Sequence, residues 1–131
     1  MKSNKTFIIA EAGVNHNGSL KRAFKMVDVA KRAGADAVKF QSFRTSNIST
    51  TKASLADYQK NKLFKSQYAL LKKLELFYKK QKKIKQYCKK KNIIFLSSAF
   101  DIESLKFLRS LKLKIFKVPS GEITNLPYLI E

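Results

Sequence analysis

Two lysines stand inside short apolar runs of the sequence, where a charged side chain is expensive to bury. Lys39 lies in the run Ala37–Phe40 and Lys117 in the run Ile115–Val118, and hydroxyl or amide groups follow each of them. An ammonium group without a partner costs much free energy away from water, although a lysine at a sheet edge can extend its amine to solvent. Because the arrangement occurs twice, it predicts an interior pocket for a small, multiply charged anion such as a phosphorylated carboxylate.

Acidic and hydroxyl side chains accompany these lysines along the sequence. Glu11 and Glu122 could neutralise the lysines, or they could act as general acids and bases or stabilise a cationic intermediate. Asp101 is placed to cap a helix, and Ser120 could either turn the chain or bind a ligand. His16, the single histidine, lies in an Asn-rich loop that fits a surface turn as well as a ligand. One histidine cannot form a metal site alone, so the sequence predicts no metal ligands.

The elements that position these residues are predicted from the spacing of apolar residues, which is typical of strands and of helices in turn along the chain. Runs rich in β-forming residues predict four strands, at 6–10, 36–43, 93–100 and 114–119. Ser19 can cap a first helix that Gly34 ends, Asp101 can cap a later one, and another starts near residue 126. After a polar stretch from residue 44 to about residue 66, one long helix is predicted with apolar residues along one face: Leu70, Leu74, Phe77, Ile84 and Cys88. Strands that alternate with helices, without a hairpin signal, indicate parallel strands joined by crossovers and therefore an α/β fold.

Ligands of parallel α/β sheets gather at the carboxyl ends of the strands. Each of the four predicted strands carries polar groups at or near that end: Glu11, Asn15 and His16; Lys39 and Gln41; Ser97, Ser98 and Asp101; Lys117, Ser120 and Glu122. We therefore expect one polar site at this edge of the sheet.

The composition fits one globular domain with a strongly basic surface. The chain has 131 residues, of which 44% are hydrophobic, and 28 Lys and Arg against 9 Asp and Glu give a net charge of +19. Only four of these cations are arginine, the residue that favours bidentate contacts to phosphates and base edges. Ten lysines fall between residues 72 and 91 on the predicted long helix, which indicates a solvated helix face; a nucleic-acid-binding module is the alternative.

The sequence also bears on the cellular compartment. No apolar run approaches the roughly 20 residues of a membrane span, and the run 7–10 is too short for the core of a signal peptide. Cys88 is the single cysteine and cannot form an intrachain disulfide. These features predict a cytoplasmic protein without membrane contacts.

Five stretches of the chain together resemble a known enzyme family. They are 7–18 (FIIAEAGVNHNG), 34–41 (GADAVKFQ), 71–76 (LKKLEL), 95–101 (FLSSAFD) and 116–127 (FKVPSGEITNLP). In this order they are similar to the amino-terminal half of N-acetylneuraminate (sialic acid) synthases, with legionaminic and pseudaminic acid synthases as near relatives. One departure is Ser98-Ala99, where the family usually has Thr-Pro, which bears on the geometry of the loop and the fit of the sugar.

The resemblance implies a (β/α)8 TIM barrel, with its first four β/α units in residues 1–131 and its second half and a carboxyl-terminal antifreeze-like domain absent. The implied reaction condenses phosphoenolpyruvate with an N-acetylated amino sugar such as N-acetylmannosamine. It yields a nine-carbon 2-keto acid and phosphate. A divalent metal, Mn²⁺ or Mg²⁺, polarises the sugar aldehyde in that family, and its ligands lie on later strands. The full-length family is implied to be homodimeric, and the 131-residue chain alone is expected neither to turn over nor to fold as a monomer.

The family's site residues carry over to this sequence by position. The resemblance implies that Lys39, Lys117 and Ser120 bind phosphoenolpyruvate. It implies that Glu11 and Glu122 are the active-site carboxylates, and it leaves their roles in proton transfer open. The sugar side comprises Gln41 and the rim residues Ser98, Phe100 and Asp101.

Two other functions remain open at this stage. A Schiff-base aldolase also uses a desolvated lysine on a barrel strand, at Lys39 or Lys117, and a basic nucleic-acid-binding module would use the net charge. Which sugar acid is made, N-acetylneuraminic, legionaminic or pseudaminic, does not follow from these residues.

Overall fold

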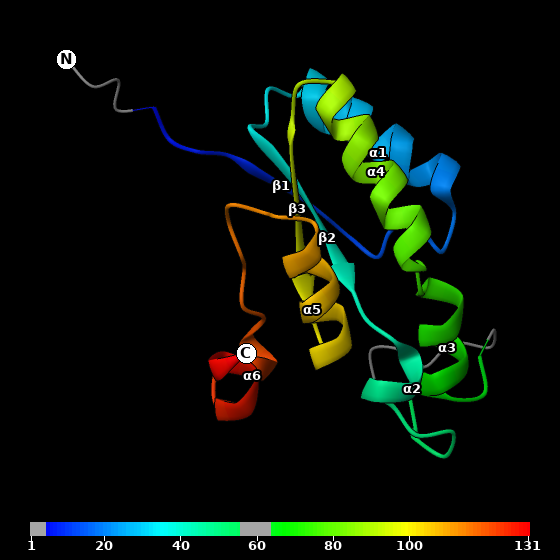
Figure 1. Cartoon of the computed structure of the whole chain (residues 1–131). Coiled ribbons are helices and arrows are strands. Elements are labelled where there is room, and N and C mark those ends of the chain that lie inside the picture. Colours follow the sequence, from blue (N-terminus) through cyan, green and yellow to red (C-terminus); the bar gives the residue numbers. More distant parts are fainter. Residues whose placement is uncertain (1–4, 56–63) are drawn as a thin grey trace.

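The chain forms an α/β structure around a three-stranded parallel sheet (Figure 1). A computed structural model describes residues 5–55 and 64–131. The strands are β1 (Ile9–Gly13), β2 (Ala37–Ser42) and β3 (Ile94–Ala99), and β2 lies between the other two. In this register Glu11 is opposite Lys39, and Gln41 is opposite Ser98. The predicted α/β class with parallel strands is confirmed.

Helices connect the strands and cover the sheet. They are α1 (Leu20–Arg32), α2 (Thr45–Ile48), α3 (Gln67–Leu74), α4 (Tyr78–Lys90), α5 (Ile102–Ser110), the short 3-10 helix η2 (Ser120–Glu122) and α6 (Leu126–Ile130). α1 and α4 lie side by side, while α5 packs against β3 (Figure 1). Most of the lysines between residues 72 and 91 are exposed along α3 and α4, as a solvated helix face requires.

The predicted helix ends of α1 and α5 are confirmed. Ser19 Oγ accepts a hydrogen bond from the backbone N–H of Arg22 at 3.3 Å, and Gly34, with φ of +81°, lets the chain turn away after α1. Asp101 Oδ1 accepts from the backbone N–H of Ser104 at 2.8 Å. These side chains satisfy backbone donors that a helix leaves unpaired at its first turn.

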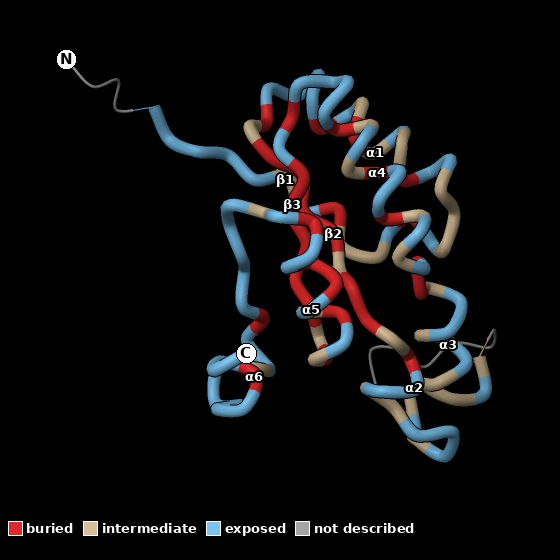
Figure 2. Tube along the Cα trace, viewed as in Figure 1, coloured by how far each residue is buried: buried red, intermediate tan, exposed pale blue. Residues whose placement is uncertain are grey.

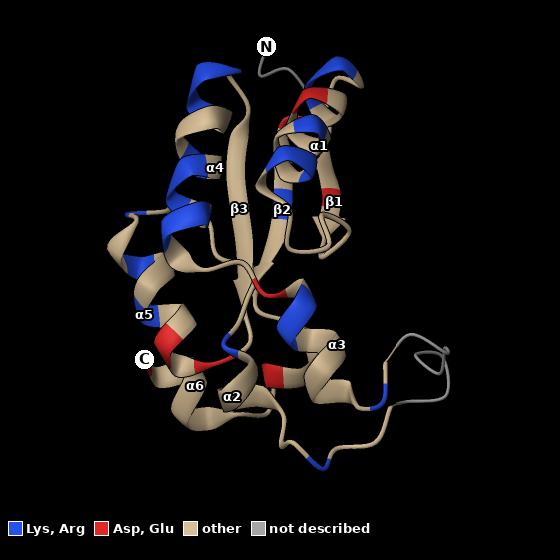
Figure 3. Cartoon of the chain, turned by 90° about the vertical axis from the view of Figure 1, so that its right-hand side faces the viewer, with Lys and Arg blue, Asp and Glu red and all other residues tan. Residues whose placement is uncertain are grey.

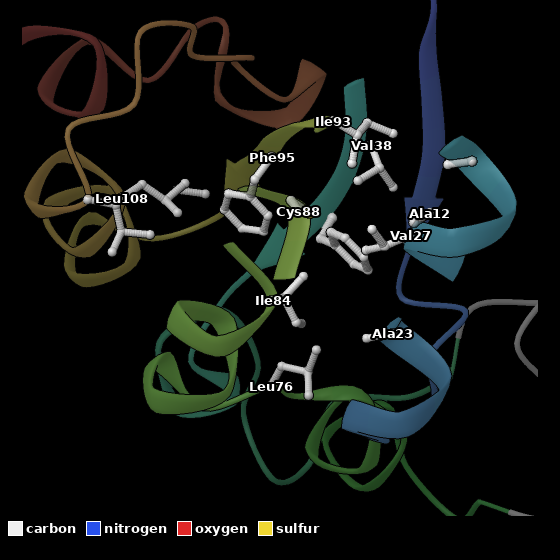
Figure 4. Packing of buried hydrophobic residues seen from close by; sticks show 14 of the residues in the cluster. Ala12, Ala23, Val27, Val38, Leu76, Ile84, Cys88, Ile93, Phe95 and Leu108 are labelled. Atoms are coloured by element: carbon white, nitrogen blue, oxygen red, sulfur yellow. The ribbon is translucent and has the colours of Figure 1, made fainter. Parts of the chain in front are cut away.

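The core lies where α1, α4 and α5 meet the sheet (Figures 2 and 4). Its most completely buried large apolar side chains are Val27, Val38, Phe40, Ile84 and Leu108. Three polar side chains inside this region pair with one another: Ser42 Oγ donates to Gln81 Oε1 at 2.6 Å and lies 2.7 Å from Ser97 Oγ. Ser42 and Ser97 therefore lie on the helix side of the sheet, since residues one apart on a strand point to opposite faces.

The predicted long helix is wrong in one respect, because the structure divides it into α3 and α4. The chain becomes extended at Glu75, with φ of −62° and ψ of 130°, and α4 begins at Tyr78. The buried carboxylate of Glu75 turns away from the helix to accept hydrogen bonds from Thr45. Those bonds, and the burial of Leu76, favour the break over a continuous helix.

The predicted fourth strand is not formed. Residues 114–119 are exposed for the most part, and no backbone hydrogen bond joins 113–118 to another segment within the described ranges. The run has strand-like composition, but an isolated extended segment gains no ladder bonds unless a neighbouring strand approaches it. The polar stretch between α2 and α3 includes residues 56–63, which lie outside the described residues.

Two further features concern the compartment and the thiol. Within residues 5–55 and 64–131, no helix has the length and apolar character needed to cross a membrane. Cys88 is buried as a free thiol in the core, and burial raises the pKa of this thiol to about 12.

Candidate active site at the strand ends

Lys39 is a buried lysine on β2 that pairs with a carboxylate on the neighbouring strand β1. Its side chain is 9% exposed, and Nζ lies 2.6 Å from Glu11 Oε2. The two residues are register partners on parallel strands, so their side chains leave the sheet on the same face. Figure 3 shows this opposite-charge pair as the blue segment of β2 beside the red segment of β1. The ammonium group is thus retained in the interior by an acidic partner whose side chain is 58% exposed.

The same face continues to Gln41 and Ser98. A Cβ built on Gly13 would lie 3.9 Å from both Gln41 Nε2 and Glu11 Oε1, so the amide and the carboxylate flank this glycine. Gly13 has φ of +53°, a conformation that suits glycine at a close approach. Ser98 is 2% exposed, and its Oγ has no hydrogen-bond partner among the described residues. Lys39, Gln41 and Ser98 therefore present a cation, an amide and an unsatisfied hydroxyl on one face of the sheet.

A cleft of about 850 Å³ opens at the carboxyl ends of β2 and β3. It brings together four sequence-predicted residues: Gln41, Phe100, Asp101 and Glu122. Four amide side chains line it, those of Gln41, Asn47, Gln67 and Asn125, between apolar side chains of α3 and the segment after β3. A cavity of about 900 Å³ lies at the other end of the strands, but ligands of parallel sheets bind at the carboxyl ends, which favours the first cleft.

Asp101 is held by the protein rather than left free for a ligand. Its Oδ1 accepts from Ser104 N–H at 2.8 Å and from the Asn47 amide at 3.3 Å. Its Oδ2 accepts from Arg44 N–H at 2.9 Å and from the Ser104 hydroxyl at 2.8 Å. Asp101 therefore ties the end of β2 to the start of α5 and shapes the wall of the cleft.

Glu75 is a site-shaping residue that the sequence analysis missed. Its side chain is 2% exposed, and Oε2 accepts from Thr45 N–H at 3.1 Å and from the Thr45 hydroxyl at 2.7 Å. Oε1 lies 3.3 Å from an Arg44 guanidinium nitrogen, and this guanidinium also covers the rings of Phe77 and Tyr78. Glu75 is the one acidic residue in the lysine-rich stretch 72–91, a signal that could have marked it.

The charge state of Glu75 follows from these contacts. Burial alone would raise the pKa of Glu75, but the hydrogen bonds from Thr45 and the charge of Lys72 outweigh it and lower the pKa below its ordinary value. The carboxylate is therefore ionised at neutral pH, and it holds the loop after β2 against the break between α3 and α4.

Lys117 and Ser120 are not brought to Lys39 in this structure. Both are exposed, and Lys117 lines a separate cavity of about 310 Å³ beside Ser97. The prediction of two interior lysines is therefore wrong for Lys117, because the segment that carries it has no strand partner. Glu122 accepts a hydrogen bond from the Asn125 amide at 2.7 Å and faces the cleft from η2.

His16 is fully buried, so the surface-turn interpretation is wrong. Its Nδ1 accepts from Gly18 N–H at 3.0 Å, while Nε2 has no partner among the described residues. Burial, followed by the charge of Lys80, lowers the pKa of His16 to about 4. Among the residues that the structure describes, no group of three His, Cys, Asp or Glu could hold a metal ion.

The sheet thus carries a buried cation and an unpartnered hydroxyl on one face and an amide-lined cleft at the carboxyl ends of its strands, which is where α/β proteins of the parallel class bind their ligands. Comparison with known proteins gives the family: the chain belongs to the NeuB family, whose model matches residues 26–131.

Two curated relatives carry the same name. The chain is 55% identical over 127 residues to the N,N'-diacetyllegionaminic acid synthase of Campylobacter jejuni, covering 95% of this chain and 38% of that protein. It is 49% identical over 125 residues to the Legionella pneumophila enzyme of this name, covering 94% and 35%. The chain thus spans little more than a third of these relatives.

A solved structure supports the fold. The N-acetylneuraminic acid (sialic acid) synthetase of Leptospira borgpetersenii serovar Hardjo-bovis, crystallised in complex with citrate, matches with a TM-score of 0.79 at 34% identity. The match covers 96% of this chain and 40% of that protein.

Proposed function

We propose that this chain is the phosphoenolpyruvate-binding part of a sugar-acid synthase. The enzyme joins phosphoenolpyruvate to an N-acetylated amino sugar and releases a nine-carbon 2-keto acid and phosphate. The single observation that carries the proposal is Lys39, a buried ammonium group on a strand, on the same face of the sheet as the unpartnered hydroxyl of Ser98. Membership of the NeuB family and the synthase names of the relatives support it.

The proposed anion site begins with Lys39 and is completed by Lys117 and Ser120. Phosphoenolpyruvate carries several negative charges, and a desolvated lysine binds such an anion more strongly than an exposed one. A bound anion can replace Glu11 as the partner of Lys39, because more than half of the Glu11 side chain is exposed and water can solvate the released carboxylate. Lys117 and Ser120 join the site when residues 114–119 pair as a strand.

In the proposed reaction, a positive charge develops on the substrate, and a carboxylate of the site can stabilise it. The methylene carbon of phosphoenolpyruvate attacks the aldehyde carbon of the open-chain sugar, and C2 becomes oxocarbenium-like. Glu11 or Glu122 stabilises this cation, because a preorganised carboxylate lowers the energy of a developing positive charge. Water then adds at C2, and phosphate leaves.

The complete protein is proposed to be a (β/α)8 TIM barrel, cytoplasmic and homodimeric, with residues 1–131 as its first four β/α units. An intact barrel of this kind has about 250 residues. The open edges of the present sheet support this proposal, since a barrel closes such edges.

The proposed sugar carries acetamido groups. The cleft supports this choice, because side-chain amides such as Gln41, Asn47 and Gln67 pair with the amide and hydroxyl groups of a sugar while its apolar wall takes the methyl groups. The names of two relatives point to a diacetamido sugar. Gln41, Ser98 and Phe100 are proposed to contact it, and Asp101 to hold the rim.

A divalent metal, which the resemblance implies, does not fit the residues of this structure. The single histidine is buried and uses Nδ1 to accept a hydrogen bond, and the described residues offer no cluster of three metal ligands. We therefore propose that residues outside this sequence hold the metal of the complete enzyme.

The test is phosphoenolpyruvate binding measured by titration calorimetry. We expect the Lys39→Met variant to bind at least tenfold more weakly than the unaltered chain. Lys5→Met is the matched control, because Lys5 pairs with Asp36 at 3.8 Å on an exposed surface and is expected to leave binding unchanged. Equal binding by the Lys39→Met variant and the unaltered chain would contradict the proposed site.

A Schiff-base aldolase is the second candidate, because Lys39 is a buried lysine on a strand. Its ion pair with Glu11 argues against it, since a Schiff-base lysine must lose its proton before it attacks a carbonyl. Borohydride reduction in the presence of pyruvate separates the two functions. A covalent adduct on Lys39 supports the aldolase, and an unmodified chain supports the synthase.

A further inference from the structure

The cleft at the carboxyl ends of β2 and β3 is lined without cations, although the chain carries a net charge of +19. Among the described residues that line it, none is lysine or arginine and three are acidic: Asp101, Glu103 and Glu122. Such a lining repels a small anion and offers acceptors to the hydroxyl and N–H groups of a neutral ligand. The cleft therefore differs in its chemistry from the buried ammonium group of Lys39.

The four amide side chains of the cleft differ in the groups that they can offer to a ligand. Asn47 Nδ2 donates to two carboxylates of the protein, each at 3.3 Å. Asn125 Nδ2 donates to Glu122 at 2.7 Å, and Asn125 Oδ1 accepts a backbone N–H of α6 at 3.4 Å. The protein thus uses the amide donors of Asn47 and Asn125 for its own contacts.

Gln41 and Gln67 keep amide donors that other side chains do not occupy. Gln67 Oε1 accepts from the Ser49 hydroxyl at 3.3 Å, whereas within residues 5–55 and 64–131 its Nε2 donates to no acceptor. Gln41 forms no side-chain hydrogen bond in the same part of the chain, and its Nε2 flanks Gly13. Two amide donors therefore remain for a ligand of the cleft, one on β2 and one on α3.

Contacts at both ends of α3 fix the position of Gln67. Its backbone N–H donates to the carbonyl of Ala53 at 3.1 Å, and Ser66 caps the helix one residue earlier. The helix stops at Glu75, whose buried carboxylate is bonded to Thr45, and α3 lies beside α2 (Figure 1). A side chain on an element held in this way is preorganised, which reduces the entropy lost when a ligand binds.

Leu71 and Leu74 follow Gln67 on the same side of α3. Spacings of four and three residues place the three side chains in one row along the helix, and all three line the cleft. An acetamido group combines a carbonyl oxygen, which can accept from Gln67 Nε2, with a methyl group, which can pack against the leucines. A hydroxyl group in the same place would leave the two leucines without an apolar contact.

We propose that Gln67, Leu71 and Leu74 form an acyl subsite that selects sugars with a second acetamido group, while Gln41 contacts the first. The inference rests on the proposed function, because it divides the proposed sugar site between two walls. It adds the residues that distinguish diacetamido from monoacetamido substrates. Recognition of one additional apolar group in a pocket discriminates about 10–200-fold, so we expect at least a tenfold preference for the diacetamido sugar.

Binding of two sugars to the 131-residue chain tests the subsite. The probes are a diacetamido hexose and N-acetylmannosamine, each titrated by ligand-observed NMR. We expect Gln67→Leu, which removes the amide and keeps a side chain of similar size, to lower the ratio of the two affinities at least tenfold. A loss of structure would weaken both sugars together, so the ratio separates recognition from folding.

Further variants locate the effect. Gln86→Leu is the matched control, because Gln86 is exposed on α4 and does not line the cleft, and the ratio should stay unchanged. Gln41→Leu should weaken both sugars and keep the ratio. Leu71→Ser removes part of the methyl contact, should lower the ratio, and replaces Gln67→Leu if that variant unfolds. A ratio that is unchanged in folded Gln67→Leu or Leu71→Ser would overturn the subsite.

Phosphoenolpyruvate titration of the unaltered chain separates the two claims. A chain that binds phosphoenolpyruvate but does not prefer the diacetamido hexose overturns the acyl subsite and leaves the proposed function standing. A chain that prefers the diacetamido hexose without binding phosphoenolpyruvate supports the subsite and contradicts the proposed function. Binding of neither ligand contradicts both.

Discussion

Replacement of Glu75 by glutamine tests how the wall of the cleft is held. The carboxylate is 2% exposed and receives two hydrogen bonds from Thr45 and an ion pair from Arg44. A hydrogen bond to a charged group contributes about 1.5–3 kcal/mol, and loss of one charge from a buried pair costs about 3–5 kcal/mol. Since glutamine keeps one acceptor oxygen, we expect Glu75→Gln to lower the free energy of unfolding by about 2–3 kcal/mol.

Glu103→Gln provides the matched control. Glu103 contacts the same guanidinium, with Oε1 at 3.4 Å from Arg44 Nε, but its side chain is 53% exposed. An exposed ion pair contributes less than about 1 kcal/mol, so urea unfolding at pH 7 should show a small loss for Glu103→Gln and a large one for Glu75→Gln. Equal losses, or a loss below about 0.5 kcal/mol for Glu75→Gln, would refute the reasoning from burial.

The pH dependence gives a second measure of Glu75. Its pKa is lowered in the folded chain, so its stabilisation is complete above the pKa of an unfolded glutamate and is lost as the pH falls through the folded value. The difference in unfolding free energy between the unaltered chain and Glu75→Gln should therefore shrink below about pH 4. A difference that stays constant down to pH 3 would contradict the lowered pKa.

Three further predictions concern His16, Gly18 and Cys88. The pKa of His16 falls to about 4 on folding, so the free energy of unfolding should decrease by roughly 3 kcal/mol as the pH drops from about 6.5 to 4. In urea unfolding, the His16→Phe variant should lack this part of the pH dependence. Gly18→Ala places a Cβ against the Lys73 carbonyl oxygen at φ of +72° and should lower the free energy of unfolding by at least about 2 kcal/mol. Gly121→Ala is the control and should be nearly neutral, because its Cβ meets nothing within 4 Å. Equal melting temperatures of the two variants would contradict this prediction. The buried thiol of Cys88, with its pKa raised to about 12, should resist a disulfide reagent at pH 8 until the chain unfolds, and rapid labelling of the folded chain would be the contrary result.

Local sequence patterns were sufficient for the elements that depend on near neighbours. Ser19 and Asp101 cap α1 and α5 as predicted, because a cap needs only a side-chain oxygen and backbone donors two or three residues away. The strand-end rule predicted polar residues at this edge of the sheet, and the register of the structure places Glu11 opposite Lys39 and Gln41 opposite Ser98.

Features that depend on distant partners could not be predicted in the same way. The helix break at Glu75 comes from bonds to Thr45, 30 residues away, which no hydrophobic period records. His16 has a turn-like sequence context, yet its loop is packed against the backbone of Lys73 near Gly18. Residues 114–119 have strand composition, but this segment does not pair with the open edge of β3, so it forms no ladder hydrogen bonds.

The most direct test of the central claim is catalysis by a chimera with the Campylobacter jejuni N,N'-diacetyllegionaminic acid synthase. In this chimera the 131 residues replace the matched region of that relative, which is 38% of its length. Incubated with phosphoenolpyruvate, a diacetamido sugar and Mn²⁺, the soluble chimera should release phosphate and form the nine-carbon acid in equal amounts. Lys39→Met should reduce the rate at least a hundredfold, which is about 2.7 kcal/mol of transition-state stabilisation. Turnover that is unchanged by Lys39→Met would contradict the assignment of Lys39 to phosphoenolpyruvate binding.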